Sequence, residues 1–101
     1  QDEWRELWAS VTAPALVLVR ASLDRVSAGL LAMGASTQNR RSRAFDLGDH
    51  LILIDYDADD HLTVVAVGGP DVVPAATWVA QQLADFGCGI ETLLPPLNPV
   101  G

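Results

Sequence analysis

The sequence predicts an α/β protein of the α+β type, built on an antiparallel sheet with a helix before, between and after the strands. Two observations carry this prediction. Three extended apolar runs follow one another over residues 43–68 and are separated only by the short polar breaks LGDH and DADDH, a pattern typical of consecutive hairpins. Before and after these runs, apolar residues recur every three or four positions, as they do on the buried side of a helix.

The length and composition indicate one globular domain. The chain has 101 residues, of which 50% are hydrophobic and 19% charged, so we expect a single domain over 1–101 with an extended tail over 95–101. The net charge of −7 argues against nucleic-acid binding, because phosphate contacts need basic side chains. No apolar run approaches the roughly 20 residues that cross a bilayer, so we expect no membrane span. Cys88 is the only cysteine, which excludes an intrachain disulfide and favours a reducing, cytoplasmic location.

The first half of the chain predicts a helix, a strand and a central helix. Residues 2–11 place four apolar side chains on one stripe of a helix that Pro14 ends: Trp4, Leu7, Trp8 and Val11. Residues 15–21, ALVLVRA, are apolar on both faces and predict a buried strand. Residues 22–34 predict the central helix, with Ser22 as its N-cap. Its buried side is expected to be Leu23, Val26, Leu30 and Met33, and its small residues, which would let another element approach closely, are Ala28, Gly29, Ala32 and Gly34.

The second half predicts strands and a closing helix. After a polar connector over 35–43, strands are expected at 43–47, 50–56 and 61–68, with a tight turn at Gly48 and Asp49. Residues 71–86 predict the closing helix, with Asp71 as a candidate cap and Pro74 in its first turn. Its expected buried stripe is Val72, Ala76, Val79, Leu83 and Phe86.

The end of the chain leaves two possibilities open. Gly87 and Gly89 are expected to end the closing helix. Residues 90–94 form either a last short strand or an extended tail. Three prolines exclude helix beyond that point: Pro95, Pro96 and Pro99.

The acidic run DYDADDH has part of the pattern of a calcium-binding loop. Asp55, Asp57 and Asp59 have the alternate spacing of such a loop. The glycine that the sixth position requires is replaced by Asp60, and the glutamate of the twelfth position is replaced by Ala66. We therefore expect this run to form a turn, with no metal and no cofactor.

The other reactive side chains do not make a catalytic set. His50 and His61 begin consecutive strands, so antiparallel pairing separates them by most of a strand length. Cys88 follows the end of a helix, where the helix dipole raises the pKa of a thiol. An enzyme would need a cleft that collects Asp55, Asp57 and His61 around an external cofactor, and we expect no enzymatic activity.

Trp78 lies away from the buried stripe of the closing helix, on the same side as Gln82 and Asp85. Aromatic side chains are enriched at interfaces, and a large exposed apolar side chain often marks one. The sequence therefore predicts that Trp78, Gln82 and Asp85 bind a partner. The alternative is that the N-terminal helix or the proline-rich tail covers Trp78.

The order helix, strand, helix, three strands, helix resembles the roadblock family of dynein light chains and bacterial GTPase partners. LDRVSAGLLAMGAS is similar to the central helix of the family, RAFDLGDHLILIDYDADDHLTVVAV to its three-stranded meander, and VVPAATWVAQQLADFG to its closing helix. The likeness covers about residues 2–87. Where the family has a hairpin before the central helix, this chain has the single strand over 15–21.

The resemblance implies a non-enzymatic scaffold or regulatory module. Roadblock modules dimerise with their central helices packed together, which would place Ala28, Gly29 and Ala32 at a dimer interface. Many of them regulate or anchor small GTPases, which is the partner class that the resemblance implies. The alternative is an oligomeric sensory or shell-type module that binds a small molecule, with the ferredoxin-like order β-α-β-β-α-β. In that fold residues 90–94 would be a core strand.

Overall fold

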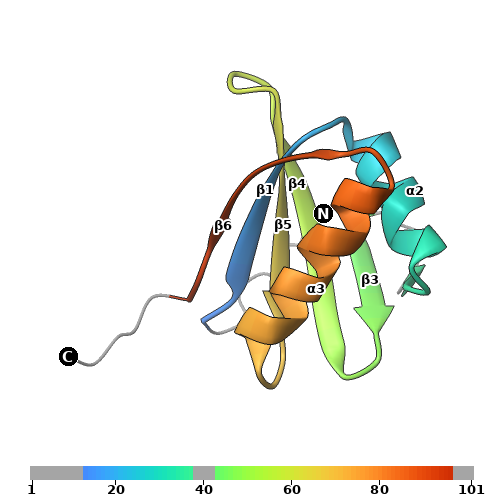
Figure 1. The fold of residues 1–101 in the computed structure, drawn as a ribbon, viewed down its shortest axis with the longest axis vertical. Helices are drawn as coiled ribbons and strands as arrows, with labels where there is room; N and C mark the ends of the chain where they lie inside the picture. The colour runs from blue at the N-terminus through green and yellow to red at the C-terminus, as the bar shows by residue number, and fades with distance from the viewer. Residues whose placement is uncertain (1–12, 38–42, 97–101) are drawn as a thin grey trace.

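A computed structural model describes residues 13–37 and 43–96, and the helix expected over residues 2–11 lies outside them. The elements follow one another as β1 (Ala15–Arg20), α2 (Leu23–Ala32), β2 (Ser36–Thr37), β3 (Ala44–Leu47), β4 (His50–Asp57), β5 (Leu62–Gly68), α3 (Val72–Asp85) and β6 (Gly89–Leu94). In Figure 1, α2 and α3 lie on one side of the sheet, with α3 crossing in front of the central strands.

The sheet has the strand order β2-β3-β4-β5-β1-β6, and every neighbouring pair is antiparallel. β1 and β4 therefore run in the same direction, with β5 between them and α2 in the connection, which is a split β-α-β arrangement. The expected α+β class and the antiparallel sheet, with helices between and after the strands, are confirmed. Because residues 89–94 pair with β1, they are a strand of the sheet, as the ferredoxin-like alternative requires.

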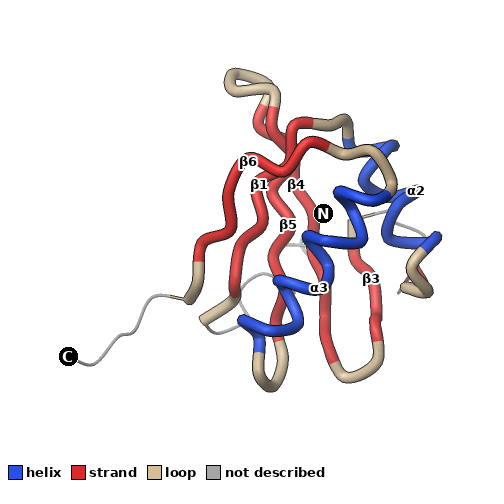
Figure 2. The backbone as a smooth tube through the Cα atoms, viewed as in Figure 1, coloured by secondary structure: helices blue, strands red, loops and turns tan. Residues whose placement is uncertain are grey.

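The expected strand boundaries agree with the structure to within one residue at most ends. The exception is β2, two residues that pair with β3 inside the segment expected to be a polar connector. Four strands therefore separate the two helices, not three. β4 and β5 form the longest hairpin, paired from Leu51 with Gly68 to Asp57 with Leu62, and it extends past the other strands (Figure 2).

The main core lies between the helices and the sheet. Alternate residues of each strand point into it, because successive side chains of a strand face opposite ways. Phe45, Ile52 and Ile54 are its largest sheet residues, and all three are fully buried. The helices contribute the buried residues Val26, Leu30, Ala76, Val79 and Leu83. A second apolar cluster, on the other face of the sheet, contains Ala44, Leu53 and Ala66 with Leu16 and Leu51 beside them.

Both helices end in the same way. Gly34 and Gly87 have positive φ angles of 105° and 99° just after the helix. At each end the next residue donates its N–H to the carbonyl five positions earlier: Ala35 to Leu30 at 3.0 Å, and Cys88 to Leu83 at 2.9 Å. This is the Schellman motif. It confirms that Gly87 ends the closing helix, whereas Gly34, expected to be a small packing residue of the central helix, ends that helix instead.

The start of α3 differs from the expectation. Asp71 occupies the N-cap position, but its side chain makes no capping hydrogen bond and its backbone is left-handed, with φ of 50°. An N-cap side chain accepts from the second or third residue of the helix, and the third residue here is Pro74, which has no N–H. The prediction that Asp71 caps the helix was therefore wrong.

No helix within residues 13–37 and 43–96 is long and apolar enough to cross a membrane.

Candidate functional site

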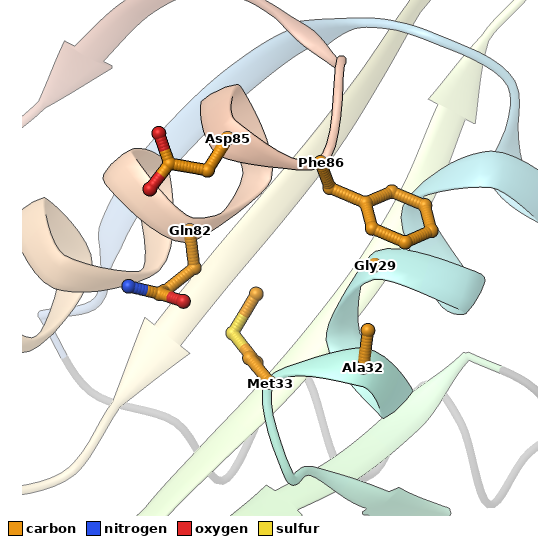
Figure 3. A pocket seen from close by; sticks show the side chains of 6 residues that line it. All are labelled: Gly29, Ala32, Met33, Gln82, Asp85 and Phe86. Atoms are coloured by element: carbon orange, nitrogen blue, oxygen red, sulfur yellow. The ribbon is translucent and has the colours of Figure 1, made fainter.

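The outer surface of the helices carries a shallow groove between α2 and α3. It has a volume of about 170 Å³ and is lined by residues from both helices and their ends: Gly29, Ala32, Met33, Gln82, Asp85 and Phe86. Figure 3 shows Met33 extending from the end of α2 toward Gln82, and the ring of Phe86 lying over Gly29. The groove therefore brings together residues predicted for the dimer interface with residues predicted for partner binding.

Gly29 sets how closely the two helices pack. A Cβ atom at this position would lie 2.8 Å from Cδ2 of Leu83 and 3.2 Å from Cδ2 of Phe86. Both distances are shorter than ordinary carbon contacts, so only glycine permits this spacing without displacing α3. Gly29 is buried within the chain, whereas Ala28 and Ala32 are exposed. The close approach that its small size allows is therefore used inside this molecule.

α3 presents Trp78, Gln82 and Asp85 on one side, because spacings of four and three residues keep side chains on the same side of a helix. Trp78 is 44% exposed, while the buried residues of the helix are Ala76, Val79 and Leu83. The expectation that Trp78 lies away from the core stripe is confirmed.

We call the outward surface of the two helices the outer helical face and define it by the half-buried Gln82 and six exposed residues: Ala28, Leu31, Ala32, Trp78, Asp85 and Phe86. Leu31 is 51% exposed and Phe86 is 38% exposed. Phe86 was expected in the buried stripe, but it follows the last helical residue and its ring turns over Gly29 instead of into the core. Asp85 is the only charged residue among the fourteen of α3, so this face combines large apolar groups with few charges, as the centres of protein interfaces do.

One basic side chain borders the outer helical face. Nη2 of Arg25 lies 3.4 Å from the carbonyl oxygen of Phe86, and the guanidinium lies over the Phe86 ring, 5.8 Å from its centroid. Arg25 therefore joins the beginning of α2 to the end of α3. It fixes the wall of the groove that Phe86 forms.

Cys88 lies behind this wall and is buried. Burial raises the pKa of its thiol, and the nearby Arg25 partly opposes the rise. The raised thiol pKa agrees in direction with the expectation from the sequence, and its largest cause is loss of water on burial. A thiol that is harder to ionise is a poor nucleophile.

The acidic hairpin forms a turn, as expected. Oδ1 of Asp57 accepts the backbone N–H of Asp59 at 3.0 Å and that of Asp60 at 3.4 Å. Asp55 lies 3.7 Å from Arg43 in an ion pair. The carboxylate of Asp57 is thus used to hold the turn, in the manner of an Asx turn.

The two histidines lie at opposite ends of the β4–β5 hairpin and have separate partners. Nε2 of His50 is 2.6 Å from the carbonyl oxygen of Pro70, and Nδ1 of His61 is 3.4 Å from the hydroxyl of Tyr56. Within residues 13–37 and 43–96, no three His, Cys, Asp or Glu side chains are grouped so that they could hold a metal ion. The hairpin residues considered for an enzyme, Asp55, Asp57 and His61, do not line the α2–α3 groove.

The sequence predicted four of the six residues that line the groove and missed Met33 and Phe86. Both were assigned to buried helix sides because their spacing fits those stripes. Each is the last residue before a Gly with positive φ, and that position was the available signal: a side chain at a helix C-cap lies at the end of the packed layer.

Comparison with known proteins finds no matching family model, no matching curated protein and no matching solved structure.

Proposed function

We propose that this protein is a non-enzymatic interaction module that binds a protein partner through its outer helical face and pairs with a second copy of itself. The observation that carries the proposal is the exposed indole of Trp78 on a helix surface with a single charge. Aromatic groups of this kind account for much of the binding energy at interfaces.

The size of the groove favours a protein partner over a small molecule. Pockets that bind drug-sized molecules have volumes of roughly 300–1,000 Å³, and the α2–α3 groove has about 170 Å³. That volume suits one side chain of a partner, with the apolar residues Phe86, in the groove, and Trp78, one turn before Gln82, providing a wider contact.

The partner class comes from the resemblance to roadblock modules, which implies a small GTPase and a cytoplasmic location. The residues of the outer helical face are compatible with this proposal, because Ala28 and Ala32 leave α2 open to close approach by another helix. Asp85 and the net charge of −7 favour a partner with a basic surface.

A second candidate function is a small-molecule sensory or shell-type module. One observation favours it, namely the pairing of β6 with β1, which gives the sheet the strand that a ferredoxin-like fold needs. In such a module the loops would bind the ligand, so substitutions on the outer helical face would leave ligand binding unchanged.

Light scattering on Trp78→Ala tests the proposal. We expect a wild-type dimer at about 100 μM, a concentration well above a dissociation constant of about 1 μM, and a monomeric variant with an unchanged circular dichroism spectrum. Tyr56→Ala is the matched control, because Tyr56 is 37% exposed on the hairpin away from the groove, and it should remain dimeric.

The partner proposal is tested by capture with both variants. A small GTPase that is retained by the wild type and by Tyr56→Ala, and lost with Trp78→Ala, would support it. A monomeric wild type that captures nothing sensitive to Trp78 would contradict it. Unfolding of Trp78→Ala at room temperature would assign Trp78 to the core and remove the observation on which the proposal depends.

A further inference from the structure

The indole of Trp78 and the α2–α3 groove lie next to each other on the outer helical face. Gln82 lines the groove, and Trp78 precedes it on the same side of α3 by four residues, which is about 6 Å along the helix. Trp78 does not line the groove of its own chain and is 44% exposed. One copy of the protein therefore presents a large side chain and a hollow as separate features.

The lining of the groove has the chemistry that an indole requires. Met33 and Phe86 provide apolar side chains, which extend between the helices in Figure 3, and Gln82 and Asp85 provide side-chain oxygens. These oxygens can accept the single N–H of an indole, which needs such a partner when the ring is buried. The side chains of Gln82 and Asp85 make no hydrogen bond or ion pair with any described residue.

The groove also has the size of one aromatic ring. An apolar cavity of about 150 Å³ takes up one benzene molecule, and the groove has a volume of about 170 Å³. The six-membered ring of an indole fits this volume and leaves the N–H toward the open side, near the exposed Asp85.

Two-fold symmetry lets two copies use both features at once. In an isologous contact each copy contributes the same patch, so an axis between Trp78 and the groove places each indole in the groove of the other copy. With that axis perpendicular to α3, the two α3 helices are antiparallel, and their Asp85 residues are about 12–15 Å apart along the helices. This separation exceeds the Debye length of about 8 Å in physiological salt. The only charged residue of α3 therefore does not oppose the pairing.

We infer that the α2–α3 groove of each copy receives Trp78 of a second copy. The site is incomplete in a single chain, because its hollow and the side chain that fills it belong to different copies. The seven residues of the outer helical face are fewer than the 20–30 on each side of a standard interface, so the association should depend on concentration. The inference rests on the proposed function, in which the chain pairs with itself, and adds which groups make the contact.

Two variants test the insertion when they are mixed. Trp78→Ala lacks the indole and keeps the groove, whereas Ala32→Leu keeps the indole and fills part of the groove from an exposed position of α2. Each alone should be monomeric in light scattering at concentrations up to about 1 mM. An equimolar mixture at the same total concentration should contain dimers, because one indole then meets one open groove. Circular dichroism shows that both variants are folded.

Ala84→Leu is the matched control for Ala32→Leu. It adds the same group at an exposed alanine of α3 that does not line the groove, and it should remain dimeric. A mixture of Trp78→Ala and Ala32→Leu that stays monomeric while the wild type is dimeric would overturn the insertion and leave self-pairing intact.

Nuclear magnetic resonance gives a direct measurement, because Met33 is the only methionine of the chain. Copies that are deuterated except for the methyl group of Met33 are mixed with protonated copies. We expect nuclear Overhauser effects from this methyl group to indole protons, which can come only from the other copy, and their loss when the protonated copies are Trp78→Ala. A wild-type dimer without these effects would overturn the inference alone. A monomeric wild type would contradict the self-pairing in the proposed function as well.

Discussion

The guanidinium of Arg25 lies over the ring of Phe86 and reaches the carbonyl oxygen of the same residue, 3.4 Å from Nη2. The last carbonyls of a helix have no partner within the helix and carry the negative end of its dipole. The side chain of Arg25, on α2, thus contacts both the carbonyl oxygen and the aromatic ring of Phe86 at the end of α3. It also places a positive charge near Cys88. This charge limits the rise in the pKa of the Cys88 thiol that burial causes.

Arg25→Met should lower the free energy of unfolding by about 0.5–1 kcal/mol, because methionine keeps most of the apolar stem and loses the cation–π contact and the hydrogen bond. Urea denaturation measures the change. Arg20→Met is the matched control: Arg20 pairs with Glu91 at 2.6 Å, but both side chains are about half exposed, and such pairs contribute about 0–1 kcal/mol. Equal midpoints for the two variants would contradict a special role for Arg25.

The stability of the protein should fall at alkaline pH in a way that depends on Cys88. Burial raises the pKa of this thiol in the folded state, so the folded chain holds its proton more tightly than the unfolded chain does. The corresponding stability is fully present below the ordinary thiol pKa of about 8.5 and is lost as the pH rises through the folded value. Melting curves between pH 7 and about 10 should show a steeper decline for the wild type than for Cys88→Ala. Parallel declines would show that another group is responsible.

Gly29→Ala should destabilise the protein despite the better helix propensity of alanine. The new methyl group would lie 2.8 Å from Cδ2 of Leu83, which is fully buried and has little room to move. Overpacking costs about 1–3 kcal/mol and the propensity gain is about 1 kcal/mol, so we expect a net loss of about 1 kcal/mol in urea denaturation. Ala28→Gly, at an exposed position of the same helix, measures the propensity term alone. If Gly29→Ala raises the free energy of unfolding by as much as Ala28→Gly lowers it, the two helices can move apart at no cost in stability.

Divalent cations should leave the melting temperature unchanged, because the carboxylate of Asp57 already holds the hairpin turn through the N–H groups of Asp59 and Asp60. A cation present at a hundred times its dissociation constant would add about 2.7 kcal/mol of stability. Millimolar calcium, magnesium and zinc are tested in turn by thermal melting, with Asp57→Asn as the control that keeps an acceptor oxygen. A rise of several degrees in the wild type that is absent in Asp57→Asn would establish a metal site.

The elements that the sequence predicted well are those where local signals agree. The strands at residues 50–57 and 62–68 have apolar runs bounded by turn residues, and Gly87 marks the end of α3 because only glycine adopts its backbone conformation easily. The position of Trp78 followed from helical spacing alone.

The elements that it predicted poorly depend on distant partners. β6 has two half-buried residues, Ile90 and Leu93, among four exposed ones, and it is a strand because β1 offers it a free edge, which no local pattern reveals. The same holds for Ser36 and Thr37, which pair with β3 in a polar segment. The contact of Phe86 with Gly29 joins residues 57 positions apart, so its departure from the buried stripe could not be read from α3 by itself.

The position of β1 between β5 and β6 has a consequence for how the chain is made. Among the described strands β1 is synthesised first, but its two neighbours in the sheet are residues 62–68 and 89–94. Its hydrogen-bonding groups therefore stay partly unpaired until residues 89–94 have been synthesised. Contacts so distant in sequence slow folding, and an unpaired apolar strand is prone to aggregate during that interval. A stop codon after α3 would leave one edge of β1 permanently open. The sheet is therefore complete only when β6 pairs with β1. Deleting β6 should first be seen as a low yield of folded protein in the cell.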